Sequence, residues 1–465
     1  MELRNKFKSY SLLMPALLLA VMFSSCKVTQ PYQRSPDIAD NKLYRDVSAT
    51  DTTTIAALRW KQIFTDTILQ SLIQEGINNN LDLKIAAARI KQADAGFKQS
   101  RLAFLPNVNG NAGTNLLKLS DAQAGNHQVY EIYTGISWEA DLWGKLKSSK
   151  RAALAALLQS DAYKRAVQTQ LVANIATSYY ALMAYDAQLL ITLKTLDNRI
   201  QDAATMKILK ESNVVTGAAV VQSEANRYSV EVTMPDIKQN IRVTENAINI
   251  LLGREPGSIA RDSLALQEVP TNLNTGVPSQ LLANRPDVQQ AEYQLRYYSE
   301  LVNVAKTYFY PTLTITAQGG LYNNSLSQFF SASSIFGNIV GGLTQPIFNN
   351  GLNKQRLKVA QAQQEEYFIT FKQTLLTAGQ EVSNALYDYQ AASDKIINRS
   401  QQIFYLQKSV DYTKELLKYT SATNYTDVLT SEQSLLAAQL SSISDKLQQL
   451  QAVVTLYRSL GGGWK

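Results

Sequence analysis

The sequence predicts a mainly α protein with a small β part, built from a duplicated unit of short strands and very long helices. Twice, at residues 136–145 and 343–354, a segment with strand-like alternation of apolar and polar residues passes directly into one with helical periodicity. Landmark residues also recur, since Pro106 and Pro311 lie 205 positions apart (311 − 106). The other pairs, at 205 to 208 positions, are Asp82 with Asp287, Trp143 with Phe348, Glu224 with Glu432, and Gly253 with Gly461. A duplication with small insertions explains this spacing.

The composition is that of a folded protein and argues against several classes of function. The chain has 465 residues, of which 45% are hydrophobic and 18% charged, with a net charge of +7. It has no dense basic patch with interleaved aromatic residues, which argues against nucleic-acid binding. One Cys allows no intrachain disulfide, and the single His, His127, lies in a predicted loop between two strands. The sequence therefore predicts no enzyme, no metal site and no cofactor except a covalent lipid.

The first 25 residues are predicted to be a lipoprotein signal peptide. Arg4, Lys6 and Lys8 precede an apolar run at 12–23, which is too short to span a bilayer as a helix. Small residues then lead to Cys26, an arrangement that resembles a bacterial lipoprotein signal, in which the Cys thiol carries the lipid. The predicted lipid-attachment residue is Cys26. The alternative is an ordinary signal peptide with an incidental Cys.

The mature chain divides at composition changes into four parts. Residues 26–59 are polar and are predicted to form a lipidated N-terminal strap, extended along the rest of the protein. Residues 60–252 form the first repeat, 253–279 a connector rich in Gly and Pro, and 280–465 the second repeat.

The strands of the first repeat are predicted at about 106–117 and 128–141, and those of the second at about 311–322 and 335–347. In each repeat one face is apolar or small and the other polar. The candidate lumen residues on the polar faces are Asn109, Asn111, Asn115, Thr312, Thr314 and Thr316. Strands of about 9–11 residues with two such faces suit a transmembrane barrel with a wet lumen. The alternative is a two-faced sheet with its polar side in solvent.

Helical periodicity dominates the rest of each repeat. One pattern runs from about Trp60 to Leu105, with Leu81 and Ile85 on one face, and another from about 142 to 213, which would span on the order of 100 Å. Two returning helices carry heptad seams. The seams are Val230, Met234, Ile237, Ile241, Thr244, Ile248 and Leu251, and Leu436, Leu440, Ile443, Leu447, Leu450, Val454 and Tyr457. Pro235 is expected to bend the first of these helices.

Four strands cannot close a barrel with a usable interior, and an open sheet edge in lipid leaves backbone groups unpaired. Two chains would supply eight strands, whose interior side chains nearly fill, whereas three chains supply twelve strands and an open lumen. The prediction is a trimer, pseudo-sixfold because each chain is duplicated. The three chains together would form a twelve-stranded transmembrane β-barrel.

Four motifs resemble the TolC-like outer-membrane efflux family, and the lipoprotein start is similar to its OprM-type branch. The motifs, in order, are Trp138–Lys145, Val277–Val288, Asp427–Leu436 and Leu456–Trp464. The resemblance implies a homotrimer that is anchored in the outer membrane by lipid as well as by its twelve-stranded β-barrel. It also implies that a long periplasmic α-helical barrel continues the β-barrel. It further implies a periplasmic adaptor (membrane fusion protein) and an inner-membrane pump of the resistance-nodulation-division class as partners.

The same resemblance implies two groups of site residues. The candidate periplasmic aperture consists of Glu224, Thr426, Asp427, Thr430 and Gln433; relatives often carry Asp at the position of Thr430, so Asp427 and Glu432 are alternative sources of charge. The strand–helix junction consists of Pro106, Trp143, Gly144, Pro311, Pro346 and Gly351. A bland alternative for Asp427 and Glu432 is that they are solvated or helix-capping carboxylates.

The predicted function is that of a passive exit duct in a tripartite efflux pump, carrying drugs or other small molecules from the pump to the outside. Two alternatives stay open. One is an outer-membrane conduit for type I protein secretion, which shares this architecture. The other is a coiled-coil spacer lipoprotein without a channel, which would explain the heptads and Cys26 but not the recurring strands.

Overall fold

The computed structural model describes residues 28–34, 43, 53–117, 127–269, 273–276, 278–419 and 424–465. The predicted signal peptide and Cys26, the predicted site of lipid attachment, lie outside these residues. The chain divides into two compact units, of which the first comprises the described parts of 1–35, 90–160 and 291–371 and the second those of 36–89, 161–290 and 372–465. No helix in the described ranges has a stretch long and apolar enough to cross a membrane.

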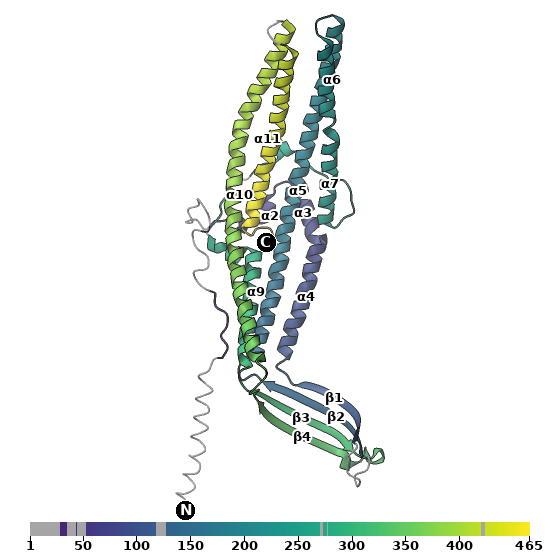
Figure 1. Cartoon of the computed structure of the whole chain (residues 1–465), viewed down its shortest axis with the longest axis vertical. Helices are drawn as coiled ribbons and strands as arrows, with labels where there is room; N and C mark the ends of the chain where they lie inside the picture. Colours follow the sequence, from purple (N-terminus) through teal and green to yellow (C-terminus); the bar gives the residue numbers. More distant parts are fainter. Residues whose placement is uncertain are drawn as a thin grey trace, which may run out of the picture. The chain divides into compact units, whose positions relative to one another are not determined.

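The first unit contains one antiparallel sheet in the order β1-β2-β3-β4 (Figure 1). Its strands are β1 Asn107–Leu117, β2 His127–Ala140, β3 Thr312–Asn323 and β4 Ile335–Thr344. All four predicted strands are confirmed, although β4 ends three residues earlier than expected. The prediction that His127 lies in a loop is wrong, because its backbone pairs with Leu117 and extends the β1–β2 ladder. The central β2–β3 pair joins the two repeats, and β1 and β4 form the edges.

The register of the sheet sorts its side chains into two faces. One row across the four strands is Val108, Ile136, Ala317 and Ile339, and the adjacent row on the other face is Asn109, Gly135, Gln318 and Asn338. The apolar face is open to solvent in the single chain: Ile339 is 79% exposed and Val108 60%. The alternation seen in the sequence therefore corresponds to one continuous apolar surface and one mainly polar surface.

The helices repeat in the same order in both halves (Figure 1). Those of the first repeat are α2 Trp60–Ile63, α3 Thr67–Asn79, α4 Leu81–Leu102, α5 Lys145–Glu211, α6 Gly217–Glu231 and α7 Met234–Leu252. Those of the second are α8 Leu281–Asn284, α9 Pro286–Thr307, α10 Leu352–Tyr419 and α11 Tyr425–Ser459. The 3₁₀ turns are η2 Ile55–Ala57, η3 Leu264–Leu266, η4 Pro278–Gln280, η5 Leu326–Gln328 and η6 Ala332–Ser334.

Three helix predictions needed correction. The expected helix from Trp60 to Leu105 is divided, because the Asn80 side chain accepts from the Leu83 amide and donates to the Leu251 carbonyl, so Asn80 starts a new helix. The long helix begins at Lys145 rather than 142, because Gly144 has φ +78. Pro235 does more than bend a helix: the chain is divided at Val232–Thr233, and Pro235 lies in the first turn of α7, where its missing N–H needs no acceptor.

Both predicted heptad seams are confirmed as the inward faces of α6, α7 and α11, since every seam residue is buried or half-buried. The largest fully buried side chains of the second unit include Tyr179 and Ile175 of α5 and Phe64, which directly follows α2. Gly76 of α3 lies against Ile175, and an added Cβ there would collide with that side chain. The core of this unit thus depends on small residues that allow close helix approach.

The duplication is visible at the ends of the two returning helices. Gly253 follows α7 with φ +69, and Gly461 follows α11 with φ +90. A Cβ on Gly253 would lie 2.9 Å from the carbonyl oxygen of Asn79, and one on Gly461 would lie closer still to that of Asn284. Asn79 and Asn284 are themselves 205 residues apart (284 − 79). Each repeat therefore ends in a glycine with a left-handed backbone conformation, and that glycine packs against the backbone of the equivalent asparagine.

The strap prediction is confirmed for residues 28–34 and wrong for the segment just before α2. Residues 28–34 are extended, and Gln30 and Asn303 of α9 exchange two hydrogen bonds of 3.3 and 2.6 Å. Arg34 forms a two-pronged ion pair with Glu292 of the same helix. By contrast, Ile55–Ala57 is a 3₁₀ turn with Ile55 and Ala56 buried, because apolar side chains there complete the core of the second unit.

Candidate functional site

The strand–helix junction is built by hydrogen bonds from tryptophan side chains to backbone carbonyls of the first unit. Trp143 Nε1 donates to the Pro311 carbonyl at 2.7 Å, and Trp138 Nε1 donates to the Phe104 carbonyl at 2.9 Å. The sequence motif around Trp143 thus ties the start of β3, which belongs to the second repeat, to the first. Pro106 directly precedes β1, and Pro346 lies in the turn between β4 and α10.

Each long helix leaves the sheet through a left-handed glycine. Gly144 precedes α5 and Gly351 precedes α10, and both have φ +78. The Asp141 carboxylate accepts from the Leu146 and Lys147 amides, both at 2.9 Å, and so caps α5. Sequence reasoning named the glycines but missed Asp141, although an Asp just before a helix is an available signal. Pro106 and Pro311 lie where a helix passes into a strand, and the other four predicted junction residues lie where a strand passes into a helix.

The six candidate lumen residues share one face of the sheet. By the register, Asn109, Asn111 and Asn115 of β1 point to the same side as Thr312, Thr314 and Thr316 of β3. Sequence reasoning missed an aromatic group on this face, in which the Phe336 ring lies 6.2 Å from Tyr133 and 6.3 Å from Tyr322. Gly320 lies directly between Tyr133 and Phe336 in the register. The three threonines therefore lie toward the helix end of this face, and the aromatic group lies toward the loop end, where Asn115 also lies.

Where α5 turns into α6 and α10 into α11, each repeat forms a hairpin with the same internal ion pair. In the first, Lys207 of α5 lies 2.6 Å from Glu224 of α6, and in the second Lys414 of α10 lies 2.5 Å from Glu432 of α11. Glu224 also contacts Arg227 at 3.2 Å. The hydrogen bond from Lys207 lowers the pKa of Glu224. Lys207 and Arg227, which pair with Glu224, thus belong to the same hairpin as Glu224.

Among the described residues, one ion pair at this end has no counterpart in the other repeat. Arg199 of α5 forms an ion pair with Glu432 of α11, and both side chains are buried, with 3% and 9% exposed. Burial raises the pKa of the adjacent Asp202, and the negative charge of Glu432 raises it further, while Lys414 and Arg199 oppose the shift. The interpretation of Glu432 as a solvated or capping carboxylate is therefore wrong. Glu432 fastens the second hairpin to the first.

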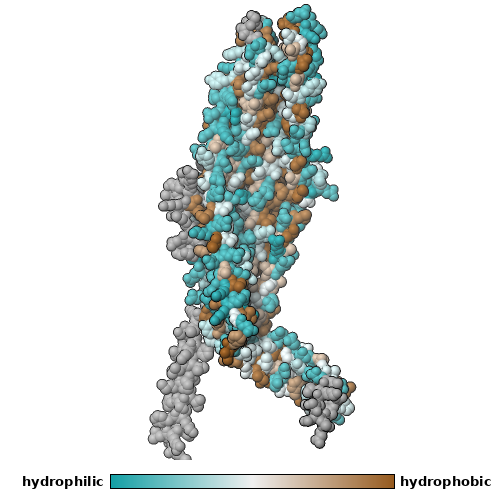
Figure 2. Space-filling view, in the orientation of Figure 1, coloured by the Kyte–Doolittle hydropathy of each residue, from teal (hydrophilic) through white to brown (hydrophobic). Residues whose placement is uncertain are grey.

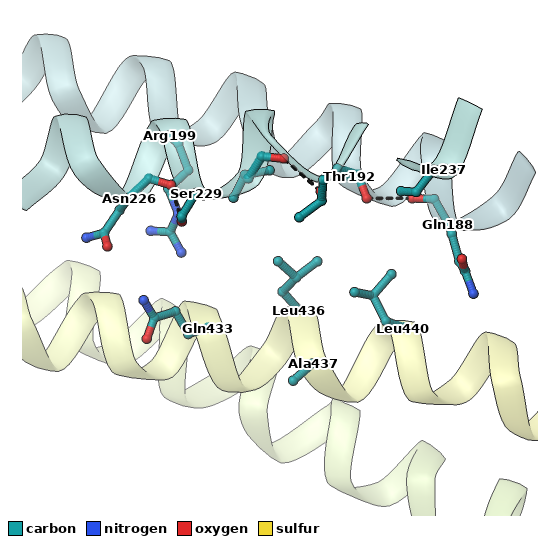
Figure 3. Close-up of a pocket in the computed structure, with 12 residues that line it drawn as sticks. Gln188, Thr192, Arg199, Asn226, Ser229, Ile237, Gln433, Leu436, Ala437 and Leu440 are labelled. Carbon is teal, nitrogen blue, oxygen red and sulfur yellow. Dashed lines mark hydrogen bonds between the residues drawn. The ribbon is translucent and has the colours of Figure 1, made fainter. Parts of the chain in front are cut away.

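The remaining candidate aperture residues occupy the start of α11. Asp427 and Asn424 form a reciprocal capping box at 3.2 Å in both directions, so the capping interpretation of Asp427 is confirmed. Thr430 donates to the Thr426 carbonyl at 2.9 Å and is exposed. Gln433 lies one turn further along and lines a cavity between the hairpins (Figure 3). The structure thus brings Thr426, Asp427 and Thr430 together at one helix end.

The space-filling view shows how hydrophobic and hydrophilic residues are distributed over the helices. In Figure 2 hydrophobic residues gather in a band between the two hairpins, while the outer flanks of the helices are mainly hydrophilic. The band lies over the part of the second unit where the heptad seams of α7 and α11 face inward. Apolar side chains are therefore concentrated where one hairpin lies against the other.

Comparison with known proteins identifies the family. The model of the family described as outer membrane efflux protein matches residues 72–254 and 277–462, well over half of the chain. CusC of Escherichia coli O6:H1, a cation efflux system protein, is 29% identical over 96% of this chain and 98% of its own length. A solved structure of CusC superimposes with a TM-score of 0.82 and 26% identity, covering 94% of this chain and all of that one.

Two further relatives have different names but similar coverage. The probable outer membrane lipoprotein SilC of Salmonella typhimurium is 29% identical over 87% of this chain and 88% of its own length. The toluene efflux pump outer membrane protein TtgF of Pseudomonas putida is 27% identical over 97% of this chain and 96% of its own. The two matched ranges coincide with the two repeats described above, and the chain belongs to the outer membrane efflux protein family.

Proposed function

We propose that three copies of this chain form the outer-membrane exit duct of a tripartite efflux pump. The observation that carries the proposal is the four-stranded sheet with one polar and one apolar face and two edges. Among the described residues, β1 and β4 have no further strand beside them. In lipid, unpaired backbone groups along such an edge are strongly unfavourable. Pairing β4 of one copy with β1 of the next removes every edge and gives twelve strands.

The helices support the same assembly. Several large apolar side chains on the long helices are exposed in the single chain, among them Leu81 at 61%, Ile85 at 51% and Leu376 at 56%. Leu81 and Ile85 lie on the face of α4 that the sequence pattern marked as apolar. Exposed apolar surface of this extent indicates contact with other protein. A helical barrel of three copies would cover these residues and continue the lumen of the β-barrel.

The partners and the cargo follow from the same proposal. A periplasmic adaptor and a pump of the resistance-nodulation-division class would complete the path at the hairpin ends of the helices, where the candidate aperture lies. The relatives' names differ in cargo, cations for CusC and toluene for TtgF. We therefore infer that this chain conducts passively and that the pump selects the molecule. Lipidation of Cys26, as the name of SilC suggests for that protein, would add a membrane anchor.

Paired substitutions on the two faces of β4 test the proposal. Ile339→Asp adds a charge to the apolar face, and Asn338→Asp adds the same charge one residue away on the polar face. If the apolar face meets lipid, Ile339→Asp prevents insertion, whereas Asn338→Asp leaves a conducting trimer with raised cation selectivity. The measurements are the mass of the detergent-extracted protein and conductance in planar bilayers. Wild-type material that is monomeric, or trimeric without conductance, contradicts the exit duct, and the second result supports the spacer alternative.

A further inference from the structure

A cavity of about 430 Å³ lies in the second unit between the first hairpin and α11. Figure 3 shows its lining, with side chains from α5, α6 and α7 on one side and from α11 on the other. The volume falls in the range of small-molecule sites in proteins. The cavity is present in the single chain, because the residues that line it come from two hairpins of the same chain.

One end of the cavity is polar and contains an unsatisfied buried donor. Asn226 of α6 is only 7% exposed, and its Oδ1 accepts from Gln222 at 3.3 Å. Its Nδ2 is fully buried and has no acceptor within the part of the chain that the structure describes. Buried amide groups are nearly always hydrogen-bonded, so an acceptor is expected to reach this atom. In Figure 3, Asn226 and Gln433 approach each other from opposite walls.

The charges at this end balance. Arg199 lines the cavity, but its Nη1 is engaged by Glu432 and by Asp202. Lys414 binds the other oxygen of Glu432. The two cations, Arg199 and Lys414, and the two acids, Glu432 and Asp202, have no net charge when all four are ionised. This end of the cavity therefore has no net charge to attract an ion. The acceptor that completes the Asn226 amide is therefore expected to be neutral.

The other end of the cavity is apolar. Ile237 of α7 faces Leu436 and Leu440 of α11 across the space (Figure 3). Val230 of α6 also lines the cavity. Leu436 and Leu440 begin the heptad seam of α11, and Val230 and Ile237 belong to the seam of the first hairpin. At this level the two seams do not meet, and the gap between them is lined by branched hydrocarbon. Such a wall favours an apolar ligand over water.

We propose that this cavity binds a small neutral amphipathic molecule, with a hydroxyl or carbonyl oxygen on Asn226 Nδ2 and a hydrocarbon part between Ile237, Leu436 and Leu440. A single ordered water could satisfy Asn226, but it would leave the apolar end empty. The proposed ligand satisfies both ends at once. It adds a binding site in the helical wall, separate from the lumen face of the sheet.

Photolabelling of the full-length protein in lipid nanodiscs tests the site. The probe is octanol that carries a diazirine, and labelled positions are mapped by mass spectrometry of peptides. The expected result is saturable labelling of the peptides around 230–237 and 436–440. Octanol is expected to compete for this labelling at lower concentration than octanoate, which has the same chain and a charged head. Labelling that does not saturate, or stronger competition by octanoate, overturns the proposal.

Two variants and a control locate the ligand. Leu440→Trp fills the apolar end and is expected to abolish labelling of these peptides. Asn226→Leu keeps the size of the side chain but removes the donor, and is expected to weaken labelling about tenfold. Val243→Trp adds the same ring at a position of α7 that is 59% exposed, outside the cavity, and is expected to change nothing. If Leu440→Trp fails to assemble, labelling of Asn226→Leu alone tests the proposal. Undiminished labelling in Asn226→Leu refutes the assignment of the site.

Discussion

The buried ion pair between Arg199 and Glu432 gives the sharpest prediction about the hairpin ends. Replacing Arg199 by Met keeps much of the side-chain volume and removes the charge that joins α5 to α11. Of the basic side chains paired with Glu432 in the described part of the chain, Lys414 alone would remain, at 2.5 Å, and it belongs to the same hairpin. The two hairpins would then lose their charged link while each stays intact. We expect the ends of the hairpins to separate more easily.

The size of the effect follows from burial. Breaking a buried ion pair by removing one partner typically costs about 3–5 kcal/mol, because the other charge is left uncompensated. Here Glu432 retains Lys414, which is 39% exposed and so is a weaker, solvent-screened partner. A cost of about 1–3 kcal/mol is therefore expected for the contact between the hairpins. It corresponds to a shift of about 5- to 150-fold toward the separated state.

The assay is conductance of the purified protein in planar bilayers, with hydrogen exchange of the α5 and α11 amides as a local readout. Arg199→Met is expected to raise the open fraction and to speed exchange in both helices. The matched control is Lys207→Met, which removes the equivalent internal pair of the first hairpin from a side chain that is 57% exposed. Wild-type conductance and exchange in Arg199→Met would show that this ion pair does not hold the hairpins together.

Three further predictions concern other parts of the chain. Gly461→Ala should lower the free energy of unfolding by at least about 2 kcal/mol, because φ is +90 and the new Cβ meets the Asn284 backbone. Gly96→Ala is the control: its Cβ would lie in open space on a helix, so it should not destabilise the protein. Thermal unfolding of both variants measures the difference. Because the pKa of Asp202 is raised, its contribution to the free energy of unfolding is fully present below the ordinary Asp pKa and is lost as pH rises through the raised pKa. Asp202→Asn should remove this pH-dependent component from unfolding curves recorded at about pH 3.5 and about pH 7.5. Cys26→Ala should abolish lipid attachment, as intact mass would show, yet leave a trimer; soluble monomers would mean that the lipid, not the barrel, anchors the chain.

The sheet could be predicted from the sequence because its determinants are local. Alternation with period two needs no knowledge of neighbours, and the register then places residues such as Asn109 and Thr316 on one face. The heptad seams were predicted for the same reason. Helix boundaries were less accurate where they depend on contacts distant in the sequence. Asn80 starts a new helix partly because it bonds to the carbonyl of Leu251, 171 residues away.

The candidate site was predicted only in part, because side-chain partners across helices leave no periodic signal. The capping role of Asp427 follows from local sequence, and the structure confirmed it. The roles of Glu432 and Arg199 do not, because these residues are 233 positions apart and nothing in the spacing of either helix indicates the other. The duplication makes Glu432 the equivalent of Glu224 in the other repeat, and this equivalence suggested that the two side chains have similar surroundings. Their ion pairs with lysine are indeed similar, but only Glu432 has a buried arginine beside it.

This difference between the repeats predicts where the proposed trimer would open first. Within a chain, Arg199 joins α5 to Glu432. In α10 the equivalent of Arg199 is Leu406 (199 + 207, the offset between the starts of α5 and α10). In a trimer in which the two repeats alternate around the ring, Leu406 would face Glu224 of the next copy. Three of the six contacts in the ring would then contain a buried ion pair and three would not, so separation should begin between copies. Leu406→Arg supplies the missing cation and should lower the open fraction in bilayers, whereas Leu406→Met should not; an unchanged open fraction in Leu406→Arg would contradict this order of opening.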